Sequence, residues 1–280
     1  MTFWLPLLLR AITSALIVVL ASVIAEAAGP FWGGLIISLP IAAGPAYVML
    51  SLQHDAAFIA DGALSSLAAN AATFVLLTAI ALLAPHYRRP TVMTGALAAW
   101  FASLLLIHQV AWTVPGAVLL NLALIVPAYV LTRTAARTPP VAAGPLRRRW
   151  YELPMRAALV GGVVAIVVTT SRALGPTVTG MAAVFPVAFT SFAFLILPRL
   201  GGPTSAAVMA SAIRAMPGFA LSLLVLHLCA ETLGVWAALA AMLLTSLLWS
   251  AGMMAVRASR VFTVSRAPRM TGSDTGTIPR

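Results

Sequence analysis

The chain has 280 residues, of which 61% are hydrophobic and only 8% are charged, and its mean hydropathy is +1.02. A soluble domain carries roughly 25% charged residues, so this composition excludes a water-soluble globule. The net charge of +11 comes from arginine alone, placed in short segments between apolar runs. This placement is typical of membrane orientation and not of a nucleic-acid-binding face. We therefore expect a protein that lies in the lipid bilayer and binds no nucleic acid.

Residue types that build metal, redox or catalytic sites are scarce in this sequence. Cys229 is the only cysteine, which excludes a disulfide within the chain, and the four histidines show no paired metal-ligand spacing. No nucleophile–base pair, glycine-rich phosphate loop or paired carboxylate is present. We therefore predict no catalytic residue, metal or cofactor, and we do not expect an enzyme.

Apolar runs of about 20 residues, long enough to cross a hydrocarbon layer of ~30 Å, recur along the whole chain. Junctions rich in glycine and proline separate them. The first run, 5–27, is longer than a signal-peptide core and lacks a positive flank, so we expect a retained helix. The pattern predicts an all-α membrane bundle of nine transmembrane helices, over residues 5–27, 31–52, 57–84, 92–112, 115–134, 155–173, 177–198, 204–228 and 234–256.

Positive charges decide how such a bundle is oriented. If the helices alternate in direction, most arginines lie on one side, and the acidic Asp55, Asp61 and Glu231 lie on the other with Arg10 and Arg172. The positive-inside rule then places the amino terminus outside and the carboxyl terminus in the cytoplasm of a bacterial inner membrane. The predicted cytoplasmic arginines are Arg88, Arg89, Arg133, Arg137, Arg147, Arg148, Arg149, Arg156, Arg199, Arg257, Arg260, Arg266 and Arg269.

Two segments are predicted to lie outside the bilayer. Residues 136–153 form a cytoplasmic linker, and residues 257–280 are polar enough to predict a disordered cytoplasmic tail. The linker contains the basic run Arg147, Arg148 and Arg149. This run has two interpretations, of which we favour the first: it fixes orientation only, or it also binds anionic lipid.

The sequence contains an internal repeat, in which residue i corresponds to residue i+146. Gly29-Pro30 matches Gly175-Pro176, and the later pairs are Arg10 with Arg156, Gly34 with Gly180 and Pro40 with Pro186. We predict one four-helix copy at 1–112, a linking helix at 113–135 and a second copy at 154–256. Because five helices separate the two starts, the second copy is predicted to be inverted. Inverted repeats are typical of secondary transporters.

Each half also resembles the GlpM-type membrane proteins, a family of small four-helix bacterial proteins. The resemblance depends on the basic residue that opens the first helix, on the Gly-x5-Pro helix and on the small residues of the last helix, Gly95 to Trp100. It covers most of both halves but not the fifth helix, the linker or the tail. It implies the four-helix architecture and a link to glycerol metabolism and alginate production, and it implies no molecular activity.

Substrate-path candidates come first from the glycines and prolines of the repeat. Pro40 and Pro186 lie near the middle of predicted helices, where each frees a backbone carbonyl that needs a partner in the bilayer. Gly34 and Gly180, six residues earlier, permit close backbone approach. These four residues either border a substrate path or form kinks and packing contacts.

Polar residues within the helices supply the remaining candidates. Arg214 lies ten residues into the eighth predicted helix, where it either binds an anionic group or extends to the cytoplasmic interface. Asp61 is ambiguous in the same way. His108 and His227 are candidates for proton coupling or are interfacial histidines. Asn70, also a path candidate, and Asn121 are predicted to donate hydrogen bonds between helices.

The leading hypothesis for function is a small secondary carrier, or a lipid or solute permease, with a path at the bilayer midplane between the inverted repeats. A non-transporting scaffold for an envelope polysaccharide or lipid pathway is the alternative, and an intramembrane enzyme comes third. Ion-coupled carriers usually place acidic groups within their helices, and here only Asp61 is available. That scarcity favours apolar or lipid-like cargo. The sequence indicates neither a substrate nor an oligomeric state.

Overall fold

A computed structural model describes residues 43–135 and 152–265, and over these residues every regular element is an α-helix. The predicted all-α fold is therefore confirmed for the described part of the chain, while Gly34, Pro40 and the linker arginines lie outside it. The helices are α3 (Ala43–Ser51), α4 (Ala56–Leu83), α5 (Arg89–His108), α6 (Val114–Thr132), α7 (Glu152–Ala183), α8 (Val187–Ile213), α9 (Met216–Ala230) and α10 (Val235–Ser265).

Five helical stretches of the described residues are long and apolar enough to cross a membrane. They are α4, α5, α6, the stretch Ala158–Ala230, and residues Val235–Val256 of α10. Their outward faces carry exposed leucines and valines, as in Leu106 of α5, Leu119 of α6 and Leu248 of α10. Apolar side chains on the outer surface of an apolar bundle are compatible with an integral membrane protein.

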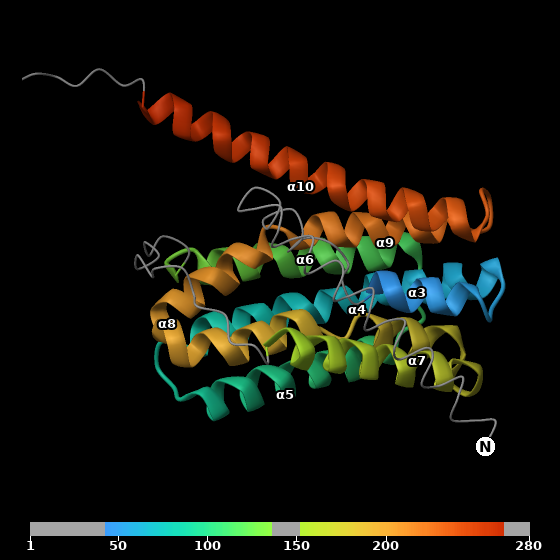
Figure 1. Ribbon diagram of the computed structural model, residues 1–280, viewed down its shortest axis with the longest axis horizontal. Helices are drawn as coiled ribbons and strands as arrows, with labels where there is room; N and C mark the ends of the chain where they lie inside the picture. Colours follow the sequence, from blue (N-terminus) through green and yellow to red (C-terminus); the bar gives the residue numbers. More distant parts are fainter. Residues whose placement is uncertain (1–42, 136–151, 266–280) are drawn as a thin grey trace, which may run out of the picture.

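The stretch Ala158–Ala230 reverses direction at two glycines. Gly175 (φ 72°) and Gly201 (φ 74°) have positive φ angles that only glycine adopts without strain, and a proline follows within two residues of each. The backbone after the first turn packs beside Gly62, near the start of α4, whereas Gly202 packs against Ala84, just after its end. Residues 176–200 therefore run beside α4 in the same direction (Figure 1).

The next segment, 202–230, returns along α4 in the opposite direction. It begins beside Ala84, and near its end the imidazole of His227 reaches the backbone of Ala60 in the first turns of α4. These reversals lie at the junctions that the sequence predicts between the helices 155–173, 177–198 and 204–228. The full nine-helix count includes residues 1–42, which lie outside the described part.

Both segments that line α4 are interrupted near their middle. The first breaks at Val184–Pro186, between α7 and α8, because proline has no amide hydrogen and cannot continue the helix. The second breaks between α8 and α9, at Arg214 and Ala215. The predicted helices 177–198 and 204–228 are therefore each formed by two shorter helical pieces.

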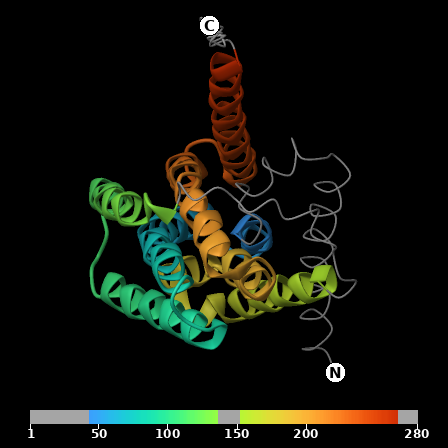
Figure 2. The ribbon, with the colours of Figure 1, turned by 90° about the vertical axis from the view of Figure 1, so that its left-hand side faces the viewer.

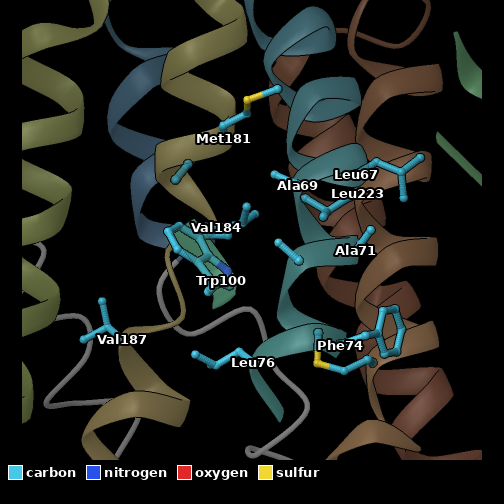
Figure 3. Close-up of a cluster of buried hydrophobic side chains, with 14 of the residues drawn as sticks. Leu67, Ala69, Ala71, Phe74, Leu76, Trp100, Met181, Val184, Val187 and Leu223 are labelled. Atoms are coloured by element: carbon cyan, nitrogen blue, oxygen red, sulfur yellow. The ribbon is translucent and has the colours of Figure 1, made fainter. Parts of the chain in front are cut away.

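The centre of the bundle is α4, which contacts α5, α6, α7, α8 and α9 (Figure 2). Alanine and serine are frequent along this helix, so its neighbours approach closely on several sides. Larger buried side chains fill the remaining space, including Phe74 and Leu76 of α4, Trp100 of α5 and Leu223 of α9 (Figure 3). This packing fixes the positions of the polar groups described next.

The last helix extends beyond the boundary expected from apolar length. The sequence predicts that the ninth helix ends near 256, but α10 continues to Ser265 and leaves the bundle (Figure 1). A membrane-length criterion detects only the apolar part of a helix, since polar residues can prolong it into water. Residues 257–265 of the predicted disordered tail are therefore helical, and residues 266–280 lie outside the described residues.

Candidate functional site

Gly180 lies in a closed contact between two helices. It is buried against α4, and a Cβ atom placed on it would overlap the backbone carbonyl of Gly62. The phenol of Tyr47, from α3, lies on the same side, 3.5 Å from the position of a Cβ on Gly62. Gly180, a candidate for a substrate path, is thus a site of close backbone packing among the described residues.

A chain of buried hydroxyl groups seals the break that follows. The Ser66 hydroxyl donates to the carbonyl of Gly180 at 2.5 Å, and the Tyr47 hydroxyl therefore donates to Ser66 Oγ at 2.6 Å. Helix ends leave carbonyls without intrahelical donors, and in lipid such groups need a protein or water partner. Here Ser66 of α4 donates to the Gly180 carbonyl, and the Ala182 carbonyl, which loses its usual donor because Pro186 has no N–H, accepts the amide of Phe185 at 3.1 Å.

Pro186 is buried at the break itself, among aromatic side chains. Phe185 packs edge-on against Trp100, with ring centroids 5.2 Å apart, and lies close to Phe101. The Pro186 carbonyl accepts both the amide and the hydroxyl of Thr190. Of the Gly34/Pro40 and Gly180/Pro186 pairs, the described one, Gly180/Pro186, is therefore a packed contact.

Two asparagines join α4 to α6. Asn70 Nδ2 donates to Asn121 Oδ1 at 2.9 Å, and Asn121 Nδ2 donates to the carbonyls of Leu67 and Ala117 at 2.8 Å each. The predicted hydrogen bonds between helices are therefore confirmed. Asn70 Oδ1 is buried and has no hydrogen-bond partner among the described residues. The role of Asn70 in a substrate path stays a prediction.

The remaining sequence candidates do not gather at one site. Asp61 is exposed in the second turn of α4, and His108 is exposed at the last residue of α5. His227 is half-buried, and its Nδ1–H donates to the carbonyl of Ala60 at 2.8 Å, which joins α9 to α4. Each of these three residues therefore lies near a helix end, and proton coupling by the histidines stays a prediction.

Unlike these three residues, Arg214 lies far from both ends of its predicted membrane segment. It is exposed at the break between α8 and α9, twelve residues after Gly202 and thirteen before His227. At 1.5 Å per residue, it lies roughly 18 Å from the turn at Gly201, which is near the middle of the segment. Its guanidinium carbon lies 5.7 Å from the centroid of the Tyr129 ring of α6. The side chain is thus near the middle of the segment 202–230 and at the surface of the described bundle.

A groove with a volume of about 660 Å³ begins at Arg214 and runs between α9 and α10. Trp249 closes one side of it, because its indole packs so closely on Gly218 that a Cβ there would overlap the ring. Arg214 is the only charged residue in the lining, and most of the others are apolar. The lining residues are Arg214, Leu221, Thr245, Leu248, Trp249, Gly252, Met253 and Val256.

The described carboxylates all lie far along the helices from this arginine. Asp55 is the N-cap of α4, Asp61 is in its second turn, and Glu231 is the C-cap of α9. The Arg214 guanidinium contacts the Tyr129 ring, and none of the carboxylates with a described side chain, Asp55, Asp61 and Glu231, pairs with it. The groove therefore presents an unneutralised cation beside an apolar surface.

A second polar cluster lies between α3 and α4, at the end of the bundle opposite the Gly201 turn. His54 Nε2–H donates to Ser171 Oγ at 2.7 Å, because the Ser171 hydroxyl itself donates to the carbonyl of Val168. Burial lowers the pKa of His54 below its ordinary value, the charge of Arg172 lowers it further, and Asp55 opposes both. His54 is therefore held as the neutral imidazole that links the loop to α7.

Comparisons of the chain with protein-family models, with curated proteins and with solved structures find no match. The resemblance to GlpM-type proteins accordingly stays a prediction.

Sequence reasoning identified Arg214 but missed the groove beside it. Thr245, Trp249 and Gly252 recur at spacings of three to four residues on α10, which places them on one face of that helix. Gly218 follows Arg214 by four residues on the neighbouring helix. A stripe of this kind, opposite a small residue on the preceding helix, is a signal that could have indicated the groove.

Proposed function

We propose that the chain is an integral membrane permease for lipid-like, anionic cargo, and that the groove between α9 and α10 is the surface along which the cargo moves. The observation that carries this proposal is Arg214, a cation at mid-depth beside an apolar groove and without a carboxylate partner in the described part of the chain. Ionisable residues within membrane helices commonly mark substrate pathways, because they are costly to retain otherwise.

An inverted repeat would give this groove two alternating orientations, and the contacts of α4 support such a repeat. Under the i+146 relation, Ala56 at the start of α4 corresponds to Gly202, and Arg89 at the start of α5 corresponds to Val235 at the start of α10. The segment 202–230 runs antiparallel to α4, as an inverted copy requires.

The pattern of helix neighbours supports the same relation. The relation exchanges α3 with part of α8 and α5 with α10, and correspondingly α3 contacts α10 while α5 contacts α8. The second of these contacts includes Arg89, whose guanidinium lies 4.2 Å from the centroid of the Phe194 ring. Carriers with inverted repeats alternate access by rocking one repeat against the other, and we propose that this chain does so.

Transport can be tested with the full chain in proteoliposomes. We expect movement of a labelled anionic amphiphile between leaflets to be faster than in protein-free vesicles. Arg214→Gln should abolish the excess rate, whereas Arg133→Gln, at the exposed end of α6, should leave it unchanged. Equal rates in wild-type and empty vesicles for anionic cargo with one and with two acyl chains would overturn the proposal.

The proposed orientation, with the carboxyl terminus in the cytoplasm of a bacterial inner membrane, has its own test. Single cysteines at Tyr87 and Leu200, introduced after Cys229→Ser, should be labelled from the cytoplasmic side. Cysteines at Gln109 and Thr232 should be labelled from outside. Labelling of Tyr87 and Leu200 from opposite sides would contradict the antiparallel arrangement of the two copies.

A non-transporting scaffold is the second candidate, and the closed contact between Gly180 and Gly62 favours it. A helix pair sealed by direct backbone packing and by the Tyr47–Ser66 hydroxyls offers no passage between the two copies at this point. If the transport assay fails and the chain co-purifies with an envelope-synthesis enzyme, the scaffold function is supported instead.

A further inference from the structure

We propose that the groove between α9 and α10 binds one long-chain carboxylate, with its head group on Arg214 and its hydrocarbon chain along Leu221, Leu248 and Met253. This inference deepens the proposed function, because it names the class of cargo. It is nevertheless testable without transport, since binding to the groove requires no movement of the two copies.

Charge complementarity indicates the head group. A guanidinium presents its N–H donors in a planar fork that matches the two oxygens of a carboxylate. Arg214 has an aromatic ring on one side and no carboxylate within the described residues. At mid-depth a lipid environment offers few hydrogen-bond acceptors, so a bound anion would satisfy donors that are otherwise unpaired.

The lining and the size of the groove indicate the chain. Leucine, methionine, valine and tryptophan side chains supply most of the walls, and Gly252 leaves open space where a side chain would otherwise stand. The volume of about 660 Å³ is within the range of roughly 300–1,000 Å³ that is typical of sites for a single small ligand. The groove is thus large enough for one extended hydrocarbon chain beside the cation.

Depth selects a carboxylate over the phosphodiester of a phospholipid. Arg214 lies roughly 18 Å from the turn at Gly201, and the hydrocarbon layer is only ~30 Å thick, so the bound head group must leave the interface. A carboxylic acid can make this journey in its neutral form, since a group in an apolar medium sheds its charge when it can, and it pairs with the guanidinium as the carboxylate after its proton is released to water at the membrane surface. A phosphodiester stays ionised at neutral pH and lacks this route.

Binding is tested with radiolabelled palmitate and the full chain in nanodiscs of phosphatidylcholine, with empty nanodiscs as the background. We expect saturable binding of one palmitate per chain. Arg214→Gln should weaken binding by roughly 10- to 100-fold, because a hydrogen bond to a charged group contributes about 1.5–3 kcal/mol. Arg214→Lys should retain part of the affinity, and Arg133→Gln should retain all of it.

The position of the chain is tested with a matched pair of glycine variants. A Cβ at Gly252 or at Gly162 meets no atom within 4 Å, and both residues are helical, but only Gly252 lines the groove. Gly252→Leu should abolish saturable binding, whereas Gly162→Leu should leave it unchanged. Because a Cβ meets no atom within 4 Å at either position, the two substitutions are matched in local space, and thermal unfolding of both variants serves as the check that each one folds.

Competition experiments distinguish the ligand chemistries. Unlabelled palmitate should displace the label, whereas hexadecanol, which has no charge, and phosphatidylglycerol, which carries a phosphodiester, should displace it at least 10-fold less well. Equal displacement by either competitor, or binding unaffected by Arg214→Gln and Gly252→Leu, would overturn the assignment. Arg214-dependent binding without uptake would leave this site intact and refute the permease, whereas uptake without such binding would refute the site alone.

Discussion

The segments 176–200 and 202–230 each contain a break in the helix, and the two breaks have different surroundings. Where the first segment meets α4, Gly180 packs on Gly62, and the buried hydroxyl of Ser66 donates to the Gly180 carbonyl just before the break. Where the second segment breaks at Arg214, the polar group faces a groove and has no carboxylate partner in the described part of the chain. Proline and glycine therefore open two similar breaks, and their neighbours make one a structural joint and the other a candidate binding surface.

The close contact between Gly180 and Gly62 predicts the largest effect on stability. Gly180→Ala places a methyl group into the Gly62 carbonyl, and backbone cannot move aside as a flexible side chain can. We expect a loss of about 3 kcal/mol in the free energy of unfolding, at the upper end for overpacked cores. Thermal unfolding in detergent measures it, and Gly162→Ala, which has free space, should be neutral or slightly stabilising. Equal stability of the two variants would contradict a closed contact.

The asparagine pair should show a smaller and unequal effect. Asn121→Ala removes three hydrogen bonds, whereas Asn70→Ala removes one. At about 0.6–1 kcal/mol for each bond in a membrane protein, we expect losses of about 2 and about 1 kcal/mol respectively. Chemical unfolding in mixed micelles measures both. The order of the two variants is the critical result, and a larger loss for Asn70→Ala would contradict the geometry.

At the groove we expect a substitution to increase the free energy of unfolding instead of reducing it. Arg214→Leu removes a cation from mid-depth, where a lipid-exposed arginine costs about 2.5–3.5 kcal/mol. Because the guanidinium also contacts Tyr129, we expect a net gain in stability of only about 1 kcal/mol. Unfolding in lipid bicelles without added amphiphile tests this, and a destabilised variant would show that Arg214 is a structural residue after all.

The smallest effect concerns pH. The folded-state pKa of His54 is lower than its unfolded value near 6.5, so the unfolded chain binds the proton more readily. Stability should therefore decrease as the pH falls below about 6.5 and level off below the folded-state pKa. His54→Gln should remove this part of the pH dependence. The melting temperatures of the wild-type protein and of His54→Gln are measured at pH 7.5 and at pH 5.5. If the melting temperature changes by the same amount between the two pH values in both proteins, the prediction is refuted.

The sequence predicted those parts of the fold that local chemistry determines. Gly175-Pro176 and the glycines before Pro203 cannot continue a helix, so both reversals in Ala158–Ala230 were predictable. Asn70 and Asn121 were predictable as donors of hydrogen bonds between helices because polar groups in apolar helices need partners, but their pairing with each other was not predicted. The break at Pro186 was indicated by proline in the same way, whereas the break at Arg214 lies inside 204–228, which was predicted as one helix.

The same reasoning could not predict which residues of different helices contact each other. Gly180 could equally face a path or a partner helix, and only the position of Gly62 on α4 distinguishes them. The groove depends on Trp249 resting on Gly218, a contact between two helices that no single-helix pattern specifies. Apolar length likewise could not place the end of α10, because polar residues after Val256 continue the helix.

The tight reversals at Gly175 and Gly201 also constrain biosynthesis. A reversal of one or two residues leaves no hydrophilic loop for the insertion machinery to hold on either side between successive crossings. We therefore expect the segments on the two sides of each reversal to enter the bilayer together rather than one at a time. Spacer sequences inserted at Gly201 would uncouple the two arms, and their main consequence should be failed insertion and degradation of the nascent chain.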